Sequence, residues 1–225
     1  MGQEFYAGSQ TFLQETSYGD NDVHFISVMA TRDNTTITID LPGTTALIES
    51  GTTDVNSVTI NLDQYESYVA RTRFDQNDTD AIAGAHITSD KDIVVTAGSQ
   101  HVRTQGVAPA DAGIDQVIPI DQLGDEYVLV RGGTGSTSDY AVVIGASDNT
   151  DVFIDGSSTA AATINEGEIY EYTLTGSLGT PHYIETSNDA YVYHVSGLSS
   201  DEVGMAVMPS KFCTGSVAIE FTRFG

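Results

Sequence analysis

The sequence predicts an all-β protein made of two tandem, internally repeated units that each resemble a β-sandwich. Three observations carry this prediction: an internal repeat as long as a domain, apolar residues that alternate with polar ones, and turn-forming residues between these runs. Alternation with a period of two is typical of strands that bury one face. A propeller-like β fold is the alternative, although its blades would have roughly half the observed period.

The repeat consists of five segments that occur in the same order in both halves. The matched segments are residues 2–5 with 124–127, 30–35 with 146–150, 59–61 with 163–165, 88–89 with 186–187, and 117–119 with 207–209. The separation between partners shrinks along the chain, and the extra residues of the first copy fall in polar stretches, where loops accept insertions. We therefore expect a first repeat with expanded loops at residues 1–120, a shorter one at 121–210, and the start of a further, truncated segment at 211–225.

The matched segments have the patterns of β-strands. Residues 37–41 and 58–62 alternate apolar and polar side chains, which predicts strands with one buried face. Four short apolar runs predict strands buried on both faces, at residues 25–30, 92–95, 127–130 and 141–144. Residues 62–69 have helical spacing, but the matched segment 168–174 is rich in aromatic and β-branched residues, so both are interpreted as strands.

Turn residues separate these runs at equivalent places in the two copies. Asp33-Asn34 and Asp148-Asn149 are the clearest pair, because Asp and Asn accept left-handed backbone. We expect about six strands in each copy, joined mainly by hairpins. A sandwich is the natural closure, since such a sheet has to cover its apolar face.

The composition excludes several classes of partner. The chain has 8 Lys plus Arg against 32 Asp plus Glu, a formal net charge of −24. Such a charge repels nucleic acids and anionic membranes. Apolar runs are too short for a membrane-spanning helix, so we expect no membrane insertion. The single cysteine, Cys213, is expected to be a buried thiol or to pair with a residue beyond Gly225.

Candidate chemistry is confined to two acidic loops of the first copy. Their oxygen-bearing side chains suit a hard cation such as Ca²⁺, although a solvated acidic turn is the alternative. The proposed ligands are Asp75, Asn77, Asp78 and Asp80 in one loop, and Asp20 and Asp22 in the other. Each of the five histidines is expected to be structural, because none coincides with another when the copies are superposed, and no known catalytic motif occurs.

Several short motifs together resemble the IgGFc-binding protein N-terminal domain family, of the type found in bacterial surface proteins. These are residues 2–6 (GQEFY), the turn at 33–35, residues 84–94, residues 119–127, and the end with Met208-Pro209 and residues 213–215. The resemblance covers nearly the whole chain. It implies an extracellular module of a larger cell-surface protein that adheres or binds and is not an enzyme. It assigns no binding residues.

The leading functional hypothesis is a non-catalytic adhesion module, secreted or on the cell surface, that recognises a glycan or glycoprotein. Two alternatives stay open. Tandem β units also serve as subunits or stalks of surface filaments, and an unpaired edge strand can join neighbouring molecules. A polysaccharide-active enzyme would need two carboxylates at a set separation, which the many acidic residues allow but do not identify.

Overall fold

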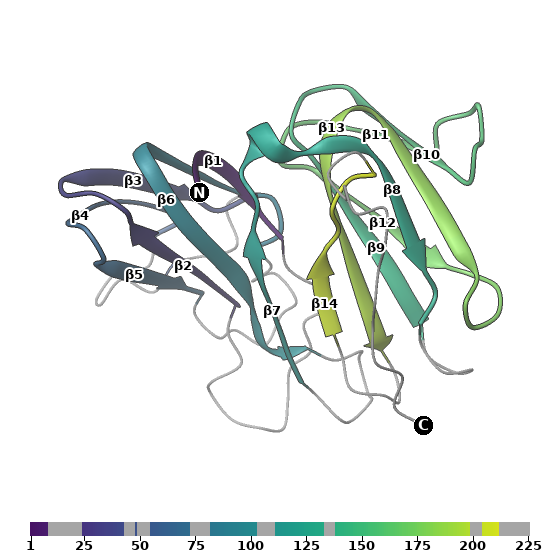
Figure 1. Cartoon of the computed structure of the whole chain (residues 1–225), viewed down its shortest axis with the longest axis horizontal. Coiled ribbons are helices and arrows are strands. Elements are labelled where there is room, and N and C mark those ends of the chain that lie inside the picture. The colour runs from purple at the N-terminus through teal and green to yellow at the C-terminus, as the bar shows by residue number, and fades with distance from the viewer. Residues whose placement is uncertain are drawn as a thin grey trace, which may run out of the picture.

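The computed structural model describes residues 1–8, 24–42, 48, 55–72, 82–102, 111–132, 138–198 and 204–211, and these are almost entirely β (Figure 1). The described part of the chain contains no helix long and apolar enough to cross a bilayer. The strands are β1 (Gly2–Ala7), β2 (His24–Ala30), β3 (Thr35–Asp40), β4 (Ser57–Leu62), β5 (Ser67–Arg71), β6 (Ala85–Val102), β7 (Asp111–Val117), β8 (Gly124–Val130), β9 (Ser138–Gly145), β10 (Thr150–Ile154), β11 (Ala162–Ile164), β12 (Ile169–Leu174), β13 (Pro181–Leu198) and β14 (Gly204–Val207), with one 3₁₀ turn, η1 (Ile120–Gln122), between β7 and β8. The all-β prediction is confirmed.

The two halves of the chain have the same topology. The first sheet has the order β4-β3-β6-β2-β5, with β1 and β7 also paired to β6. The second has the order β11-β10-β13-β9-β12, with β8 and β14 paired to β13. Each strand of the first sheet thus has its counterpart seven strands later, which confirms two tandem β units. The domain boundaries at residues 120 and 210 stay a prediction.

One long strand lets each sheet fold back on itself. In the first unit, β1 and β3 pair mainly with residues 85–89 of β6, whereas β2 and β7 pair with residues 93–102. The result is two layers, β4-β3-β6-β1 and β5-β2-β6-β7, that share one strand and form a nearly closed sandwich. β13 has the same role in the second unit.

Three details of the sequence prediction are wrong. The first is the expectation of about six strands joined mainly by hairpins. Each unit has seven described strands, and consecutive strands pair only at β3–β4 and β6–β7 and at their counterparts, because the other connections cross between layers.

The second error is one of the matched segments of the repeat, which the pairing register corrects. Leu62 lies opposite Thr35 and Ile164 lies opposite Thr150, so the segment at 163–165 corresponds to 61–63, two residues from the predicted match. A shift of two keeps the same face of a strand, so sequence patterns do not detect it.

The third error concerns burial. Of the four apolar runs, residues 141–144 are buried on both faces as predicted, whereas residues 25–30 and 127–130 bury one face. Val128 and Val130 are each 50% exposed, and Met29 is 37% exposed. In residues 92–95, Ile93 and Val95 are buried and Val94 is partly buried. The reason is that the first unit covers the outer face of β9, while nothing described covers the outer faces of β2 and β8.

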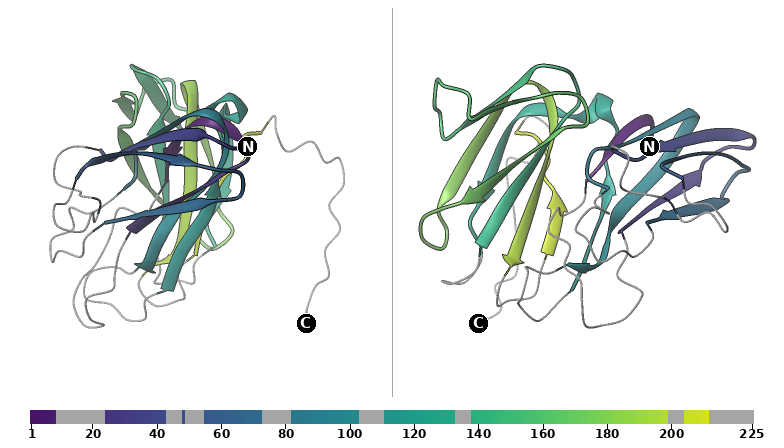
Figure 2. Two further views of the ribbon diagram at one scale, coloured as in Figure 1. Left: turned by 90° about the vertical axis from the view of Figure 1, so that its left-hand side faces the viewer. Right: turned by 180° about the vertical axis from the view of Figure 1, so that it is seen from behind.

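The two units meet where an edge of the first packs on a face of the second (Figures 1 and 2). The edge consists of β1 and β7, and the face consists of β9, β13 and β14. One hydrophobic cluster runs across this junction. It joins the interior of the first unit to the outward side chains of β9 and β13, which are Val142, Ile144, Tyr191, Tyr193 and Val195. A separate cluster fills the interior of the second unit.

Two buried tyrosines of β13 satisfy backbone groups of the first unit. The Tyr191 hydroxyl accepts a hydrogen bond from the Tyr6 N–H at 3.3 Å and donates one to the Ile118 carbonyl at 2.7 Å. The Tyr193 hydroxyl accepts from the N–H of Gly8 at 3.1 Å. Because water does not reach these groups, each bond removes the cost of an unpaired buried donor or acceptor.

The shared cluster predicts that the two units unfold in a single transition. Tyr193→Phe leaves the buried Gly8 N–H without its acceptor and should lower the free energy of unfolding of the whole chain by about 1–3 kcal/mol. Guanidinium unfolding at pH 7 measures both effects. Tyr65→Phe is the matched control, because Tyr65 is 75% exposed. Two separate transitions, with only the later one shifted by the substitution, would contradict this account of the junction.

Candidate functional site

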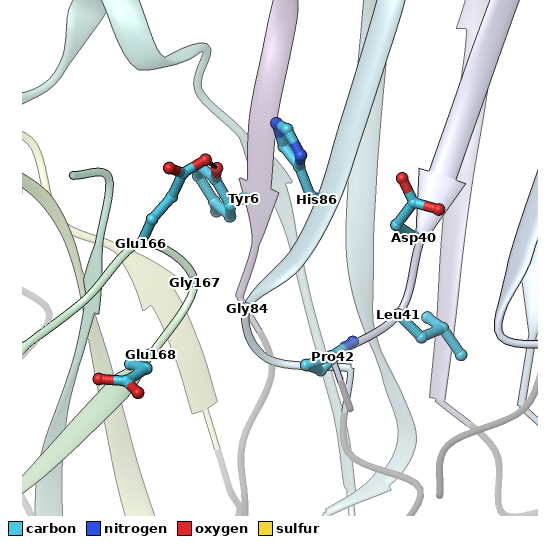
Figure 3. Close-up of a pocket in the computed structure, with 9 residues that line it drawn as sticks. All are labelled: Tyr6, Asp40, Leu41, Pro42, Gly84, His86, Glu166, Gly167 and Glu168. Carbon is cyan, nitrogen blue, oxygen red and sulfur yellow. Dashed lines mark hydrogen bonds between the residues drawn. The ribbon is translucent and has the colours of Figure 1, made fainter. Parts of the chain in front are cut away.

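A cleft of about 440 Å³ lies at the junction of the two units (Figure 3). The first unit supplies one wall, from β1, β6 and the end of β3, and the second unit supplies the turn between β11 and β12. The lining residues are Tyr6, Asp40, Leu41, Pro42, Gly84, His86, Glu166, Gly167 and Glu168. The lining combines apolar surface with one histidine and three carboxylic acids, Asp40, Glu166 and Glu168, so the ionisable groups of the cleft are mainly acidic.

The wall from the first unit follows from strand pairing. Tyr6 on β1 and Asp40 on β3 are both register partners of His86 on β6, so the three residues form a row across adjacent strands. Figure 3 shows His86 between the other two. The Tyr6 and His86 rings are stacked, with centroids 4.7 Å apart and planes inclined by 6°. Stacking fixes the plane of the imidazole.

The turn from the second unit is held by its own hydrogen bonds. The Glu168 carboxylate accepts from the Asn165 N–H at 2.8 Å, and the Asn165 side chain accepts from the Asn149 N–H at 3.2 Å. The first unit has the same arrangement, in which Glu66 accepts from the Asp63 N–H at 2.9 Å. By this match, Gln64 and Tyr65 stand where Glu166 and Gly167 stand in the second unit.

Glycine is required at the closest approach of the two units. Tyr65 and Gly167 both have left-handed backbone, with φ of 68° and 72°, but Tyr65 projects into solvent while Gly167 faces Gly84. A Cβ on Gly84 would overlap the Gly167 carbonyl oxygen, and a Cβ on Gly167 would lie 3.1 Å from the Gly84 carbonyl oxygen. The paired glycines therefore bring Glu166 close to the first unit.

Three side chains from the two units converge beside the cleft. Glu4 and His86 belong to the first unit and Glu166 to the second, and one potential ligand atom of each lies within 4.8 Å of the others. His86 Nε2 is 2.9 Å from Glu4 Oε1. Imidazole and carboxylate groups at this spacing can share a proton or coordinate a divalent cation.

Tyr6 orients the carboxylate from the second unit. Its hydroxyl donates a hydrogen bond to Glu166. Burial, and then the hydrogen bond to the Glu166 carboxylate, raise the pKa of Tyr6 far above its ordinary value, so the hydroxyl keeps its proton throughout the physiological range. The phenol thus remains a donor, and Glu166 remains an acceptor directed toward the first unit.

The structure does not test the metal ligands that the sequence predicts. Asp20, Asp22, Asp75, Asn77, Asp78 and Asp80 lie outside the described residues, so the calcium hypothesis for the two loops stays a prediction. Sequence reasoning missed the cluster of Glu4, His86 and Glu166. One difference between the two copies could have pointed to this place: the second copy has Glu166-Gly167 in the turn where the first copy has Gln64-Tyr65.

Other described histidines fit the structural role expected of them. His24 is fully buried, and burial lowers its pKa to about 3. His182 is buried, with Nε2 donating to the Thr175 carbonyl at 2.9 Å and Nδ1 3.0 Å from the Asp155 carboxylate. His194 Nε2 lies 3.3 Å from the buried carboxylate of Asp139.

A family model described as IgGFc binding protein matches residues 1–218 of the chain. The match extends over both units and therefore includes every residue of the cleft. No curated protein and no solved structure matches the chain.

Gly84→Ala should push the two units apart. We expect it to lower the free energy of unfolding by about 1–3 kcal/mol more than Gly156→Ala, because only the first substitution meets the facing backbone. Gly156 is the matched control, since its φ of 75° carries a similar conformational cost and nothing lies within 4 Å of its added Cβ. Denaturant unfolding of both variants gives the difference. If both variants lost the same free energy of unfolding, Gly84 and Gly167 would not be in close contact.

The junction should weaken at alkaline pH. Burial raises the pKa of Tyr6, Tyr191 and Tyr193 above the ordinary value near 10. A raised folded-state pKa gives stability that is present below the unfolded-state pKa and is lost as pH rises through the folded-state pKa. Stability should therefore fall from about pH 10 upward, by about 1.4 kcal/mol per pH unit for each such tyrosine.

Tyr193→Phe should reduce this alkaline slope by about one tyrosine's contribution, as measured by unfolding between pH 9 and 11.5. The exposed residue Tyr65 again provides the Tyr→Phe control. A slope that does not change in Tyr193→Phe would show that this phenol ionises in the folded chain as readily as in the unfolded one.

Proposed function

Because the chain belongs to the IgGFc binding protein family, we propose that it is an extracellular, non-catalytic binding module that recognises a glycan or glycoprotein. The observation that carries the proposal is the family match over residues 1–218, which includes both units. Neighbouring domains of a larger surface protein would hold the module at the cell surface.

Charge restricts the ligand. A net charge of −24 repels sulfated and other anionic polysaccharides, so a neutral glycan or the surface of a glycoprotein suits this chain better. The acidic groups of the cleft, Asp40, Glu166 and Glu168, can accept hydrogen bonds from sugar hydroxyls. Their placement on two units fixes the spacing of these acceptors.

The shared core and the tyrosine bonds of the junction favour a preformed surface, which lowers the entropic cost of binding.

A panel of neutral and anionic glycans and glycoproteins tests the proposal, with calcium and with chelator. The panel should include the immunoglobulin Fc fragment with and without its N-linked glycan, because this pair separates recognition of sugar from recognition of protein. We expect saturable binding to at least one neutral glycan or glycoprotein, without release of product. Release of soluble sugar would favour the polysaccharide-active enzyme, and concentration-dependent assembly without ligand binding would favour the filament subunit.

A further inference from the structure

We propose that Glu4, His86 and Glu166 bind a zinc-class divalent cation that bridges the two units. Glu4 and His86 project from adjacent strands of the first unit, and Glu166 projects from the β11–β12 turn of the second. An ion held by all three would connect the units beside the cleft. This site is independent of which macromolecule the module recognises.

The spacing of the donor atoms suits such an ion. Zinc takes nitrogen and oxygen ligands at about 2.0–2.2 Å, which places the ligands of a tetrahedral site about 3.3–3.5 Å apart. The atoms of the cluster lie within 4.8 Å of one another, and His86 Nε2 is already 2.9 Å from Glu4 Oε1. An ion held by all three atoms requires the two glutamate side chains to rotate until these distances approach the tetrahedral value.

One neighbouring residue, Tyr6, orients two of the three ligands. His86 stacks on Tyr6, and the Tyr6 hydroxyl donates to Glu166. Metal ligands in proteins are commonly held in this way by a second set of hydrogen bonds. Tyr6 therefore prearranges one ligand from each unit while it remains outside the coordination sphere.

In the second unit, the counterpart of Glu4 is Glu126, and its carboxylate is neutralised by neighbouring side chains. Glu4 lies opposite Thr88, and Glu126 lies opposite Glu185, so the register shifts the predicted match of residues 88–89 by one, to 185–186. By the same register, His86 and Tyr183 occupy matching positions. Glu126 accepts from Tyr183 and from Lys211, whose ammonium group also lies 5.9 Å from the centre of the Tyr183 ring. In the first unit, His86 takes the place of Tyr183, and a second carboxylate, that of Glu166, lies within 4.8 Å of Glu4 and His86.

Two carboxylates within 4.8 Å repel each other unless a proton or a cation lies between them. The donor set selects among cations, because an imidazole nitrogen with two carboxylates suits zinc, whereas Ca²⁺ prefers six to eight oxygens. Three protein ligands leave a fourth position open, which is the arrangement of zinc sites that accept water or an external ligand.

Thermal unfolding of the untagged protein, freed of metal with chelator and then given Zn²⁺ or Ca²⁺, tests the site. We expect Zn²⁺ to raise the midpoint by about 5–10 °C at a free concentration near 100 times its dissociation constant. Calorimetric titration should give one Zn²⁺ per chain. Co²⁺ in place of Zn²⁺ should give the visible absorption of a four-coordinate site.

Three variants separate this site from nonspecific binding. Glu166→Gln keeps an acceptor for Tyr6, and His86→Gln keeps a polar side chain, yet each should weaken Zn²⁺ binding at least tenfold and remove the thermal shift. Glu185→Gln is the matched control, because Glu185 is an exposed glutamate outside the cluster, and this variant should bind Zn²⁺ as the unchanged chain does. Equal binding by all variants, or a larger shift with Ca²⁺ than with Zn²⁺, would overturn the proposal.

Discussion

The structure depends on the burial of one face of β13 beneath the edge of the first unit. That face carries Tyr191 and Tyr193, whose rings lie in the shared hydrophobic cluster and whose hydroxyls bond the backbone of the first unit. A phenol is suited to this place because its ring supplies apolar area while its hydroxyl satisfies a backbone group that water no longer reaches. The same contact covers the edge strands β1 and β7, which would otherwise expose backbone to other chains.

This junction turns a repeat into an asymmetric molecule. Two units with one topology pack edge against face, so equivalent positions have different surroundings. Tyr65 and Gly167 occupy the same place in the same turn, but the tyrosine is in solvent and the glycine is pressed against Gly84. The acidic cleft exists only because of this packing, since neither unit alone brings Glu166 to His86.

Much of the fold could be predicted from sequence because strand patterns and turn residues are local. Asn34 and Asn149 have φ of 53° and 56°, the left-handed backbone expected of the two Asp-Asn turns. The packing of one unit on the other could not be predicted, since the run at 141–144 is apolar on both sides in the same way as the run at 127–130, of which only one side is covered. For the same reason the cluster of Glu4, His86 and Glu166 was missed: its members are far apart in sequence, and each is unremarkable within its own strand or turn.

The position of the cleft at the junction has a consequence for binding. A ligand that contacted Asp40 on one side and Glu168 on the other would stabilise the packed arrangement of both units, by an amount that grows with its free concentration relative to its dissociation constant. The converse also holds. A loosened junction would separate the two walls of the cleft and lower the affinity for any ligand that contacts both. The affinity for such a ligand would therefore be coupled to the tyrosine bonds of β13, although Tyr193 does not line the cleft. Recognition in this protein would be a property of the packed pair of units, and a binding fragment cut between β7 and β8 would lose one wall of its site.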